Sequence, residues 1–224
     1  MWETLSVPWQ ACMDEAWSAY RAGSRPIGAV ITDAAGQIVA RGRNRIEETS
    51  GDPRTIFDHP LAHAEMNALL AFDDRVHDRY TCALYATTEP CPLCFGAFYM
   101  SGLRVLQYGA REGWAGSTNL FGTTPYLSRK SIRIHGPETV LGLGSIVTAL
   151  ATEDTLRTRD PTTESALIPV WRAIDPEGVT LGEALVASGD LQQWKDADWP
   201  ASAVVNAIAA MRTGLAQHGQ ETVP

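Results

Sequence analysis

The sequence is poor in cysteine and histidine and contains no long apolar run. Four of its 224 residues are cysteine and five are histidine, which indicates a reducing, cytoplasmic setting rather than a disulfide framework. No apolar stretch approaches the roughly 18 residues that cross a bilayer. The first four residues lack the basic and apolar segments of a signal peptide. We therefore expect a cytoplasmic protein without a membrane partner.

Positive charge is also scarce. The chain has 18 lysine and arginine residues against 26 aspartate and glutamate residues, a net charge of −8. Residues 1–136 hold 13 basic against 14 acidic residues, a net of −1, whereas residues 137–224 hold 5 against 12, a net of −7. Neither part has the basic stripe on which tight binding to a phosphate backbone depends. The composition favours a small-molecule substrate and no nucleic-acid partner.

The residues that are best suited to bind a metal or transfer a proton lie in two short motifs, His63-Ala64-Glu65 and Pro90-Cys91-Pro92-Leu93-Cys94. Zinc prefers imidazole and thiolate ligands in a tetrahedron, and a catalytic site leaves one of the four positions to water. His63, Cys91 and Cys94 supply three ligands, and Glu65 is free to move protons as a general base and acid. The joint motif predicts a catalytic zinc site.

Either motif alone would be a weak signal. A bare Cys-x-x-Cys pair also occurs in redox centres and as half of a structural zinc finger. A structural site needs a fourth strong ligand, and the chain has no second Cys-x-x-Cys pair. Glu65 also argues for catalysis, because a structural site has no use for an acid beside an open ligand position.

Both motifs are expected at the start of a helix. Cys91 and Cys94 are three residues apart and share one face of a helix over 91–101, for which Thr88 is the expected cap. The positive end of that helix would lower the pKa of the thiols. The residues after His63 are good helix formers, so we place His63 at the start of a helix over 63–72.

Hydrophobic periodicity predicts an α/β core over residues 1–136. A further helix is expected at 9–21 and strands at 27–32, 37–43, 81–87, 104–110 and 131–135. The strand, helix, strand order across 81–110 implies parallel pairing through a right-handed crossover. The predicted fold is a three-layer α/β sandwich around a mixed sheet.

Residues 137–224 have a different character and are expected to form an acidic helical extension. Helices are predicted at 139–156, 165–174, 181–187 and 201–215, joined by Asp-Pro and Trp-Pro turns. Trp171, Trp194 and Trp199 are the expected contacts that pack this extension on the core. It contains no recognisable chemical motif.

The stretch from about residue 26 to residue 110 carries motifs that resemble the cytidine deaminase-like superfamily. The resemblance is to the branch with guanine deaminases, bacterial tRNA adenosine deaminases and yeast-type cytosine deaminases. The matching stretches are Pro26-Ile-Gly-Ala-Val-Ile, Gly42-Arg-Asn44, His63-Ala-Glu-Met-Asn-Ala-Leu, Tyr85-Ala-Thr-Thr-Glu-Pro-Cys-Pro-Leu-Cys and Tyr108-Gly-Ala-Arg. The resemblance implies a five-stranded sheet, a homodimer, one zinc ion per chain and hydrolytic release of ammonia.

The resemblance also implies roles for individual residues. It makes Glu65 the catalytic proton shuttle and places the Ala64 backbone amide against the substrate. Asn44 is implied to hydrogen-bond the substrate ring, since a side-chain amide both donates and accepts; its alternative is a turn residue after a strand. Trp114 is implied to stack on a heterocycle, or else to pack in the core or a dimer interface. Glu89 is expected to support the metal site through hydrogen bonds.

The leading hypothesis is a zinc-dependent hydrolytic deaminase of a free nucleobase or related amino-heterocycle, with a guanine-like aminopurine favoured. The alternatives are a cytosine or nucleoside deaminase, a tRNA adenosine deaminase, and a non-catalytic interaction module stabilised by zinc. The deaminating half of riboflavin biosynthesis is disfavoured, because its cysteines are further apart and residues 137–224 lack a nucleotide-binding glycine motif.

Overall fold

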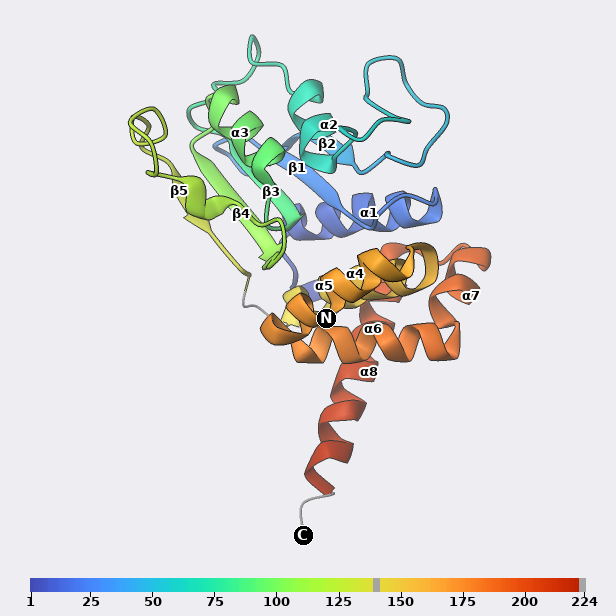
Figure 1. Cartoon of the computed structure of the whole chain (residues 1–224). Helices are drawn as coiled ribbons and strands as arrows, with labels where there is room; N and C mark the ends of the chain where they lie inside the picture. Colours follow the sequence, from blue (N-terminus) through green and yellow to red (C-terminus); the bar gives the residue numbers. More distant parts are fainter. Residues whose placement is uncertain (139–141, 222–224) are drawn as a thin grey trace.

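Five strands form one mixed sheet in the computed structural model, which describes residues 1–138 and 142–221 and, of residues 215–221, the backbone (Figure 1). Along the chain they are β1 Gly28–Thr32, β2 Ile38–Arg43, β3 Ala83–Thr88, β4 Val105–Ala110 and β5 Arg133–His135. Their order in the sheet is β2-β1-β3-β4-β5. β1 is antiparallel to β2 and β3, whereas β3, β4 and β5 are parallel. The predicted mixed sheet and its parallel crossover are confirmed.

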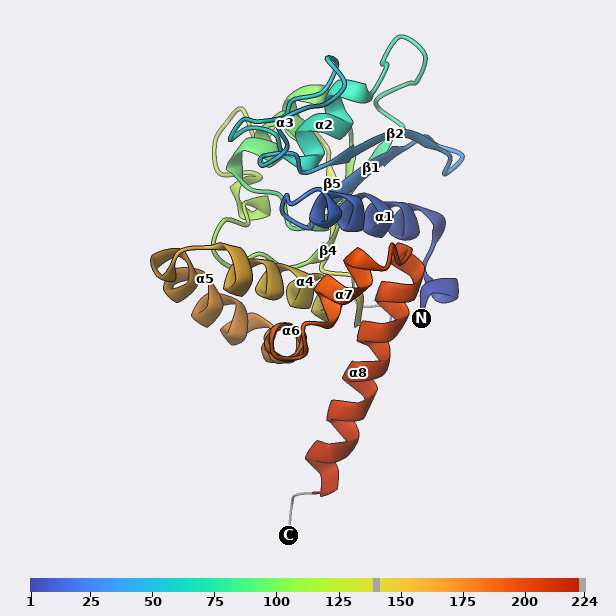
Figure 2. The same cartoon turned by 90° about the vertical axis from the view of Figure 1, so that its right-hand side faces the viewer.

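Helices cover both faces of the sheet, which gives the predicted three layers. Helix α1, Val7–Arg21, packs on one face, and α2, Ala64–Ala71, and α3, Pro92–Ser101, pack on the other (Figures 1 and 2). Alternation along β1 explains this arrangement, because successive side chains point to opposite faces. Val30 joins the core cluster on the α1 side, while Ala29 and Ile31 join the cluster under α2 and α3.

The C-terminal part of the chain is helical throughout its described residues from 143 onward, apart from short turns. Its helices are α4 Leu143–Thr158, α5 Pro161–Ile174, α6 Pro176–Ser188, α7 Asp190–Asp196 and α8 Ala201–Glu221. Two further single-turn 3-10 helices lie in the N-terminal part, at Trp2–Thr4 and Thr118–Leu120. The predicted start of the first of the C-terminal helices, at residue 139, lies outside the described residues.

Three predictions for this part were wrong in detail. Helix α5 begins at Pro161 rather than 165, because the Asp160 carboxylate accepts the backbone N–H groups of Thr162 and Thr163. Helix α6 begins at Pro176 rather than 181, and Asp175 caps it in the same way. Helix α7 was not predicted, because seven residues are too few to show a periodic pattern.

The extension packs beneath α1, on the side of the sheet away from α2 and α3 (Figure 2). The indole Nε1 of Trp17 donates to the backbone oxygen of Trp199 at 2.7 Å, and Trp194 and Trp199 pack against the core cluster of that side. Helix α8 contacts α1 near its own N-terminus and then runs away from the rest of the molecule. A domain boundary at residue 136 stays a prediction.

Two of the four cysteines are buried inside the core. Cys12 and Cys82 are both 0% exposed, and burial raises the pKa of each thiol above its ordinary value. They act as small, largely apolar side chains. No helix among the described residues has both the length and the apolar character needed to span a membrane.

Candidate active site

Three side chains that zinc prefers converge at the starts of α2 and α3. Nδ1 of His63 lies 3.5 Å from Sγ of Cys91 and 3.3 Å from Sγ of Cys94, and the three ligand atoms lie within 4.8 Å of one another. Tetrahedral zinc, with Zn–S bonds of about 2.3 Å and Zn–N bonds of about 2.0–2.1 Å, places sulfur and nitrogen about 3.5 Å apart. The donor set and its spacing therefore fit a zinc ion.

Each ligand motif occupies the position just before a helix. His63 is the N-cap of α2 and Cys91 is the N-cap of α3, both in extended conformation. The expected cap by Thr88 was wrong: this residue ends β3, and no side chain caps α3. The reason is Pro92, which starts the helix and disfavours helical geometry at the preceding residue, so Cys91 itself takes the capping position.

Close packing of α2 on β2 fixes the position of His63. Gly42, in β2, faces this helix, and a Cβ atom there would lie 2.2 Å from the backbone nitrogen of Ala68 and 2.3 Å from the oxygen of Ala64. Only glycine permits such a close approach. The same sheet delivers the chain from β3 to Cys91, so strand pairing holds the two ligand-bearing helices together.

Glu65 lies beside the ligands in the first turn of α2 and is only 4% exposed. Burial raises the pKa of its carboxyl group, the negative charge of Cys91 raises it further, and the positive charge of His63 opposes this change. A carboxyl group whose pKa is moved toward neutrality is suited to accept and return a proton. Its assignment as the proton shuttle stays a prediction.

The electrostatics of the ligands favour a thiolate at Cys91. Hydrogen bonds from Cys94 and His63 lower the pKa of Cys91 to about 4 despite its partial burial. Cys94 is the donor to that thiolate and is buried, so its pKa is raised. The hydrogen bond to Cys91 also raises the pKa of His63, although burial opposes it. A thiolate is the form of cysteine that binds metal.

Asn44 lies next to the start of α2. Its backbone N–H donates to Ile27 at 3.0 Å, and the following residue, Arg45, donates to Ala62, just before His63. The side chain is 1% exposed, and its Oδ1 accepts the N–H of Ile46 at 3.2 Å. Within the described part of the chain no acceptor takes its Nδ2 group, which is therefore available to a ligand.

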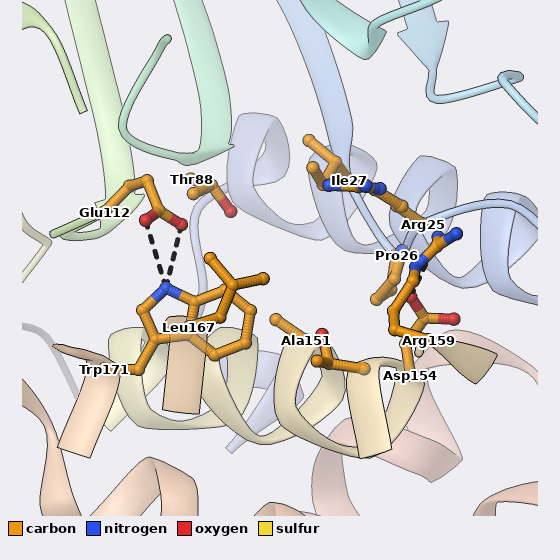
Figure 3. A pocket seen from close by; sticks show the side chains of 11 residues that line it. Arg25, Pro26, Ile27, Thr88, Glu112, Ala151, Asp154, Arg159, Leu167 and Trp171 are labelled. Carbon is orange, nitrogen blue, oxygen red and sulfur yellow. Dashed lines mark hydrogen bonds and ion pairs between the residues drawn. The ribbon is translucent and has the colours of Figure 1, made fainter. Parts of the chain in front are cut away.

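A small cavity of about 70 Å³ lies between the sheet and the C-terminal helices (Figure 3). Its upper wall comes from the sheet and includes Thr88 and Glu112, while Leu167 and Trp171 of α5 form much of its lower wall. None of the three zinc ligands lines the cavity, but Thr88 is only three residues from Cys91. Arg25 also lines the cavity.

Comparison with known proteins agrees with this geometry. Residues 4–110 match the family model described as the cytidine and deoxycytidylate deaminase zinc-binding region. The chain is 34% identical to the tRNA-specific adenosine deaminase of Bacillus subtilis over 134 residues. These residues cover 58% of this chain and 74% of that protein. The chain belongs to the cytidine and deoxycytidylate deaminase family. Its resident metal is accordingly zinc, and the three ligands are placed to bind it.

Relatives within this deaminase family differ in substrate. The guanine deaminase of Bacillus subtilis is 39% identical over 90 residues, which cover 39% of this chain and 51% of that protein. A solved structure of a mutant of NE0047 in complex with 8-azaguanine matches with a TM-score of 0.51 and 26% identity, over 66% of this chain and 82% of that one. The chain spans only 16% to 64% of the length of three other relatives, two tRNA(Ile)-lysidine synthases of Deinococcus species and the tRNA-specific adenosine deaminase of Aquifex aeolicus.

The remaining candidate residues of this deaminase differ in their exposure. Ala64 is fully buried at the first position of α2. Trp114 is 61% exposed and lines a wider hollow of about 330 Å³ that also includes Arg25 and Leu167. His59, four residues before His63, does not join the cluster and instead accepts the N–H of Leu61. The roles of Ala64 and Trp114 stay predictions.

Two supporting side chains hold the loops around this deaminase site. Asn67 of α2 is 2% exposed; it donates to the backbone oxygens of Arg43 and Ile56 and accepts the N–H of Ile56 at 2.8 Å. Glu89, beside the cysteine motif, accepts the N–H groups of Glu112 and Thr118. The supporting role of Glu89 agrees with expectation, whereas Asn67 was missed, although a polar residue on an otherwise apolar helix face was a signal.

Proposed function

We propose that this chain is a hydrolytic deaminase of a free nucleobase or a related amino-heterocycle, with a guanine-like aminopurine as the favoured substrate. The observation that carries the proposal is a buried carboxyl group, Glu65, beside three convergent zinc ligands. A structural zinc site does not need such a group. The similarity to a guanine deaminase and to a structure with bound 8-azaguanine supports a base-sized substrate.

The residues of the chain have defined tasks in this reaction. Zinc, when bound, supplies a Lewis acid that makes water nucleophilic near neutral pH. Glu65 accepts a proton as the water oxygen bonds to the ring carbon, and it returns that proton to the amino nitrogen as the carbon–nitrogen bond breaks. Ammonia leaves, the ring keeps the oxygen, and Glu65 is again a carboxylate.

Substrate binding is assigned to three further groups. The free Nδ2 group of Asn44 donates to an acceptor on the ring, and the backbone N–H of Ala64 has no helical partner because it lies in the first turn. Trp114 covers the ring from the loop after β4. We also propose a homodimer, which light scattering of the purified protein tests directly.

A tRNA adenosine deaminase is the second candidate. The relative that the chain matches over 74% of its length has this activity. The charge distribution argues against it, since residues 1–136 have a net charge of −1 and residues 137–224 a net charge of −7. A cytosine or nucleoside deaminase, and a non-catalytic module, remain alternatives that the same assay separates.

The test is ammonia release from zinc-loaded protein with guanine, adenine, cytosine, their nucleosides, 2,6-diaminopurine, triazines and a tRNA. We expect turnover of guanine or a related aminopurine, and a loss of about 100- to 10,000-fold in Glu65→Gln with unchanged zinc content. Glu3→Gln is the matched control, because Glu3 is exposed in the N-terminal 3-10 helix. Activity on tRNA alone would support the second candidate. No ammonia release from any of these substrates would favour the non-catalytic module.

A further inference from the structure

The Glu112 carboxylate is held in place by donors from two distant parts of the chain. Its Oε1 accepts the backbone N–H of Trp114 at 2.8 Å. The indole Nε1 of Trp171, 59 residues away, lies 3.0 Å from Oε1 and 3.1 Å from Oε2. Oε1 also accepts the backbone N–H of Ala115 at 3.4 Å. Each carboxylate oxygen has two lone pairs, so the remaining acceptor capacity of Glu112 is at Oε2, in a side chain that lines the cavity (Figure 3).

Helix α5 packs tightly on the loop that carries Glu112. A Cβ atom at Gly113 would lie 2.2 Å from Cδ1 of Ile174 and 2.8 Å from Cγ1 of Val170, the two apolar neighbours of Trp171 on this side of the helix. Trp171 is 9% exposed and is the one buried residue of α5 within the described structure. The glycine and the buried indole therefore fix the helix against the carboxylate at two adjacent points.

The loop is also joined to the metal site. Glu89 accepts the N–H of Glu112, and the N–H of Ser117 donates to the oxygen of Pro90, the residue before Cys91, at 3.0 Å. β4 ends at Ala110, two residues before Glu112, and β3 ends at Thr88, three residues before Cys91, on the same edge of the sheet. The loop that carries Glu112 and the segment that leads to Cys91 therefore start side by side.

We propose that Glu112 accepts a hydrogen bond from a ring N–H or a second amino group of the substrate, and that Trp171 is the positioning residue that orients this carboxylate. The proposal rests on the proposed function and narrows its substrate class to amino-heterocycles with a donor group away from the departing amine. The C-terminal extension then contributes to substrate recognition through α5, although it contains no ligand of the zinc.

The first test is steady-state kinetics of Trp171→Phe, which removes the N–H and keeps an aromatic ring. We expect KM to rise about 10-fold and kcat to stay within about 2-fold, because a contact made equally in the ground state and the transition state affects binding alone. Trp194→Phe is the matched control: Trp194 lies in α7 of the same extension, and its side chain packs against Trp199. A Trp171→Phe variant with wild-type KM would contradict the proposal.

A double-mutant cycle separates positioning from general stabilisation. Glu112→Ala should raise KM more than Trp171→Phe does, and the double variant should equal Glu112→Ala, since Trp171 acts only through that carboxylate. Additive effects would overturn the positioning role. If circular dichroism shows that Trp171→Phe does not fold, the Glu112→Gln variant provides the test. The ratio of its KM values for the best substrate and for the analogue methylated at the donor nitrogen should be closer to one than the ratio of the wild type. Unchanged discrimination would refute the assignment.

A binding measurement separates this proposal from the proposed function. Calorimetry with the Glu65→Gln protein gives the Kd of each base without turnover. Bases should bind about 10-fold more weakly when Trp171→Phe is added. If the wild-type protein turns over a base while Trp171 and Glu112 variants keep its KM and Kd, the function stands and this inference fails. If no base is turned over but binding depends on both residues, the inference stands and the proposed reaction fails.

Discussion

Replacing Gly42 with alanine tests whether the packing of α2 on β2 positions the zinc ligands. The new Cβ atom would lie 2.2 Å from the nitrogen of Ala68 and 2.3 Å from the oxygen of Ala64. Both are backbone atoms, so neither can rotate away. Restoring an ordinary contact of about 3.5 Å requires the helix and strand to separate by about 1 Å.

A displacement of this size is large on the scale of a metal site. Zinc–ligand distances are held to about ±0.2 Å, and His63 lies directly before α2 while both cysteines belong to α3. We expect Gly42→Ala to weaken zinc binding at least 100-fold, measured by competition with a chromogenic chelator. Overpacking should cost a further 1–3 kcal/mol or so of stability in the zinc-free protein, which lowers Tm by about 2–4 °C for each kcal/mol.

Gly96→Ala is the matched control for this prediction. Gly96 lies within α3, two residues after Cys94, and a Cβ atom there would meet nothing within 4 Å. Alanine should stabilise this helix by up to about 1 kcal/mol and leave the zinc Kd unchanged. If Gly42→Ala binds zinc with wild-type affinity, the contact between α2 and β2 does not set the geometry of the site, and the reasoning above is refuted.

Three further predictions concern the loops and the metal. Asn67→Ala leaves the N–H of Ile56 without its acceptor and should lower the free energy of unfolding by about 1–3 kcal/mol in denaturant titrations; an unchanged midpoint would show that the loop before α2 is held elsewhere. Burial tends to raise the pKa of Glu48, but the hydrogen bonds and charges of Arg43 and Arg45 outweigh it and hold that pKa below its usual 4.5. The contacts of the Glu48 carboxylate therefore stabilise the fold above about pH 4.5, and this stabilisation is lost as the pH falls through the lower pKa of the folded state. The Tm advantage of the wild type over Glu48→Gln should accordingly shrink from about pH 6 to about pH 3; a constant advantage would contradict this. Removal of zinc by a chelator should lower Tm, and zinc but not magnesium should restore it, because a ligand at 100 times its Kd adds about 2.7 kcal/mol to the native state; equal rescue by magnesium would refute a site of thiolate and imidazole ligands.

The local features of this fold were predictable because short-range chemistry sets them. The alternation of Ala29, Val30 and Ile31 requires a strand that is buried on both faces, and the structure places these residues in two different core clusters. His63 and Cys91 lie at the starts of helices as predicted, although each is the N-cap and not the first helical residue. The strands and helices of the sheet layers follow from patterns within about ten residues, whereas the convergence of His63 with Cys91, 28 residues away, was predicted from the joint motif.

The features that sequence did not reveal depend on long-range packing or on a single hydrogen bond. Trp171 was expected to pack the extension on the core, but its partner Glu112, 59 residues away, was not predicted because it lies in no recognisable motif. The helix ends at 161 and 176 were misplaced because Asp160 and Asp175 cap them, and an aspartate before a proline is equally typical of a turn. The cap of α3 was wrong because Pro92 fixes the start of the helix more strongly than a hydroxyl three residues earlier.

The burial of Cys12 and Cys82 makes the chain a natural reporter of its own metal content. Both thiols are fully inaccessible, and their raised pKa values keep them protonated and slow to react at neutral pH. Cys94 is equally buried and its pKa is also raised, so a thiol-reactive dye added to the native protein has one target, Cys91, which zinc protects. The rate of labelling thus measures how often the metal departs, without any substrate and without any engineered probe.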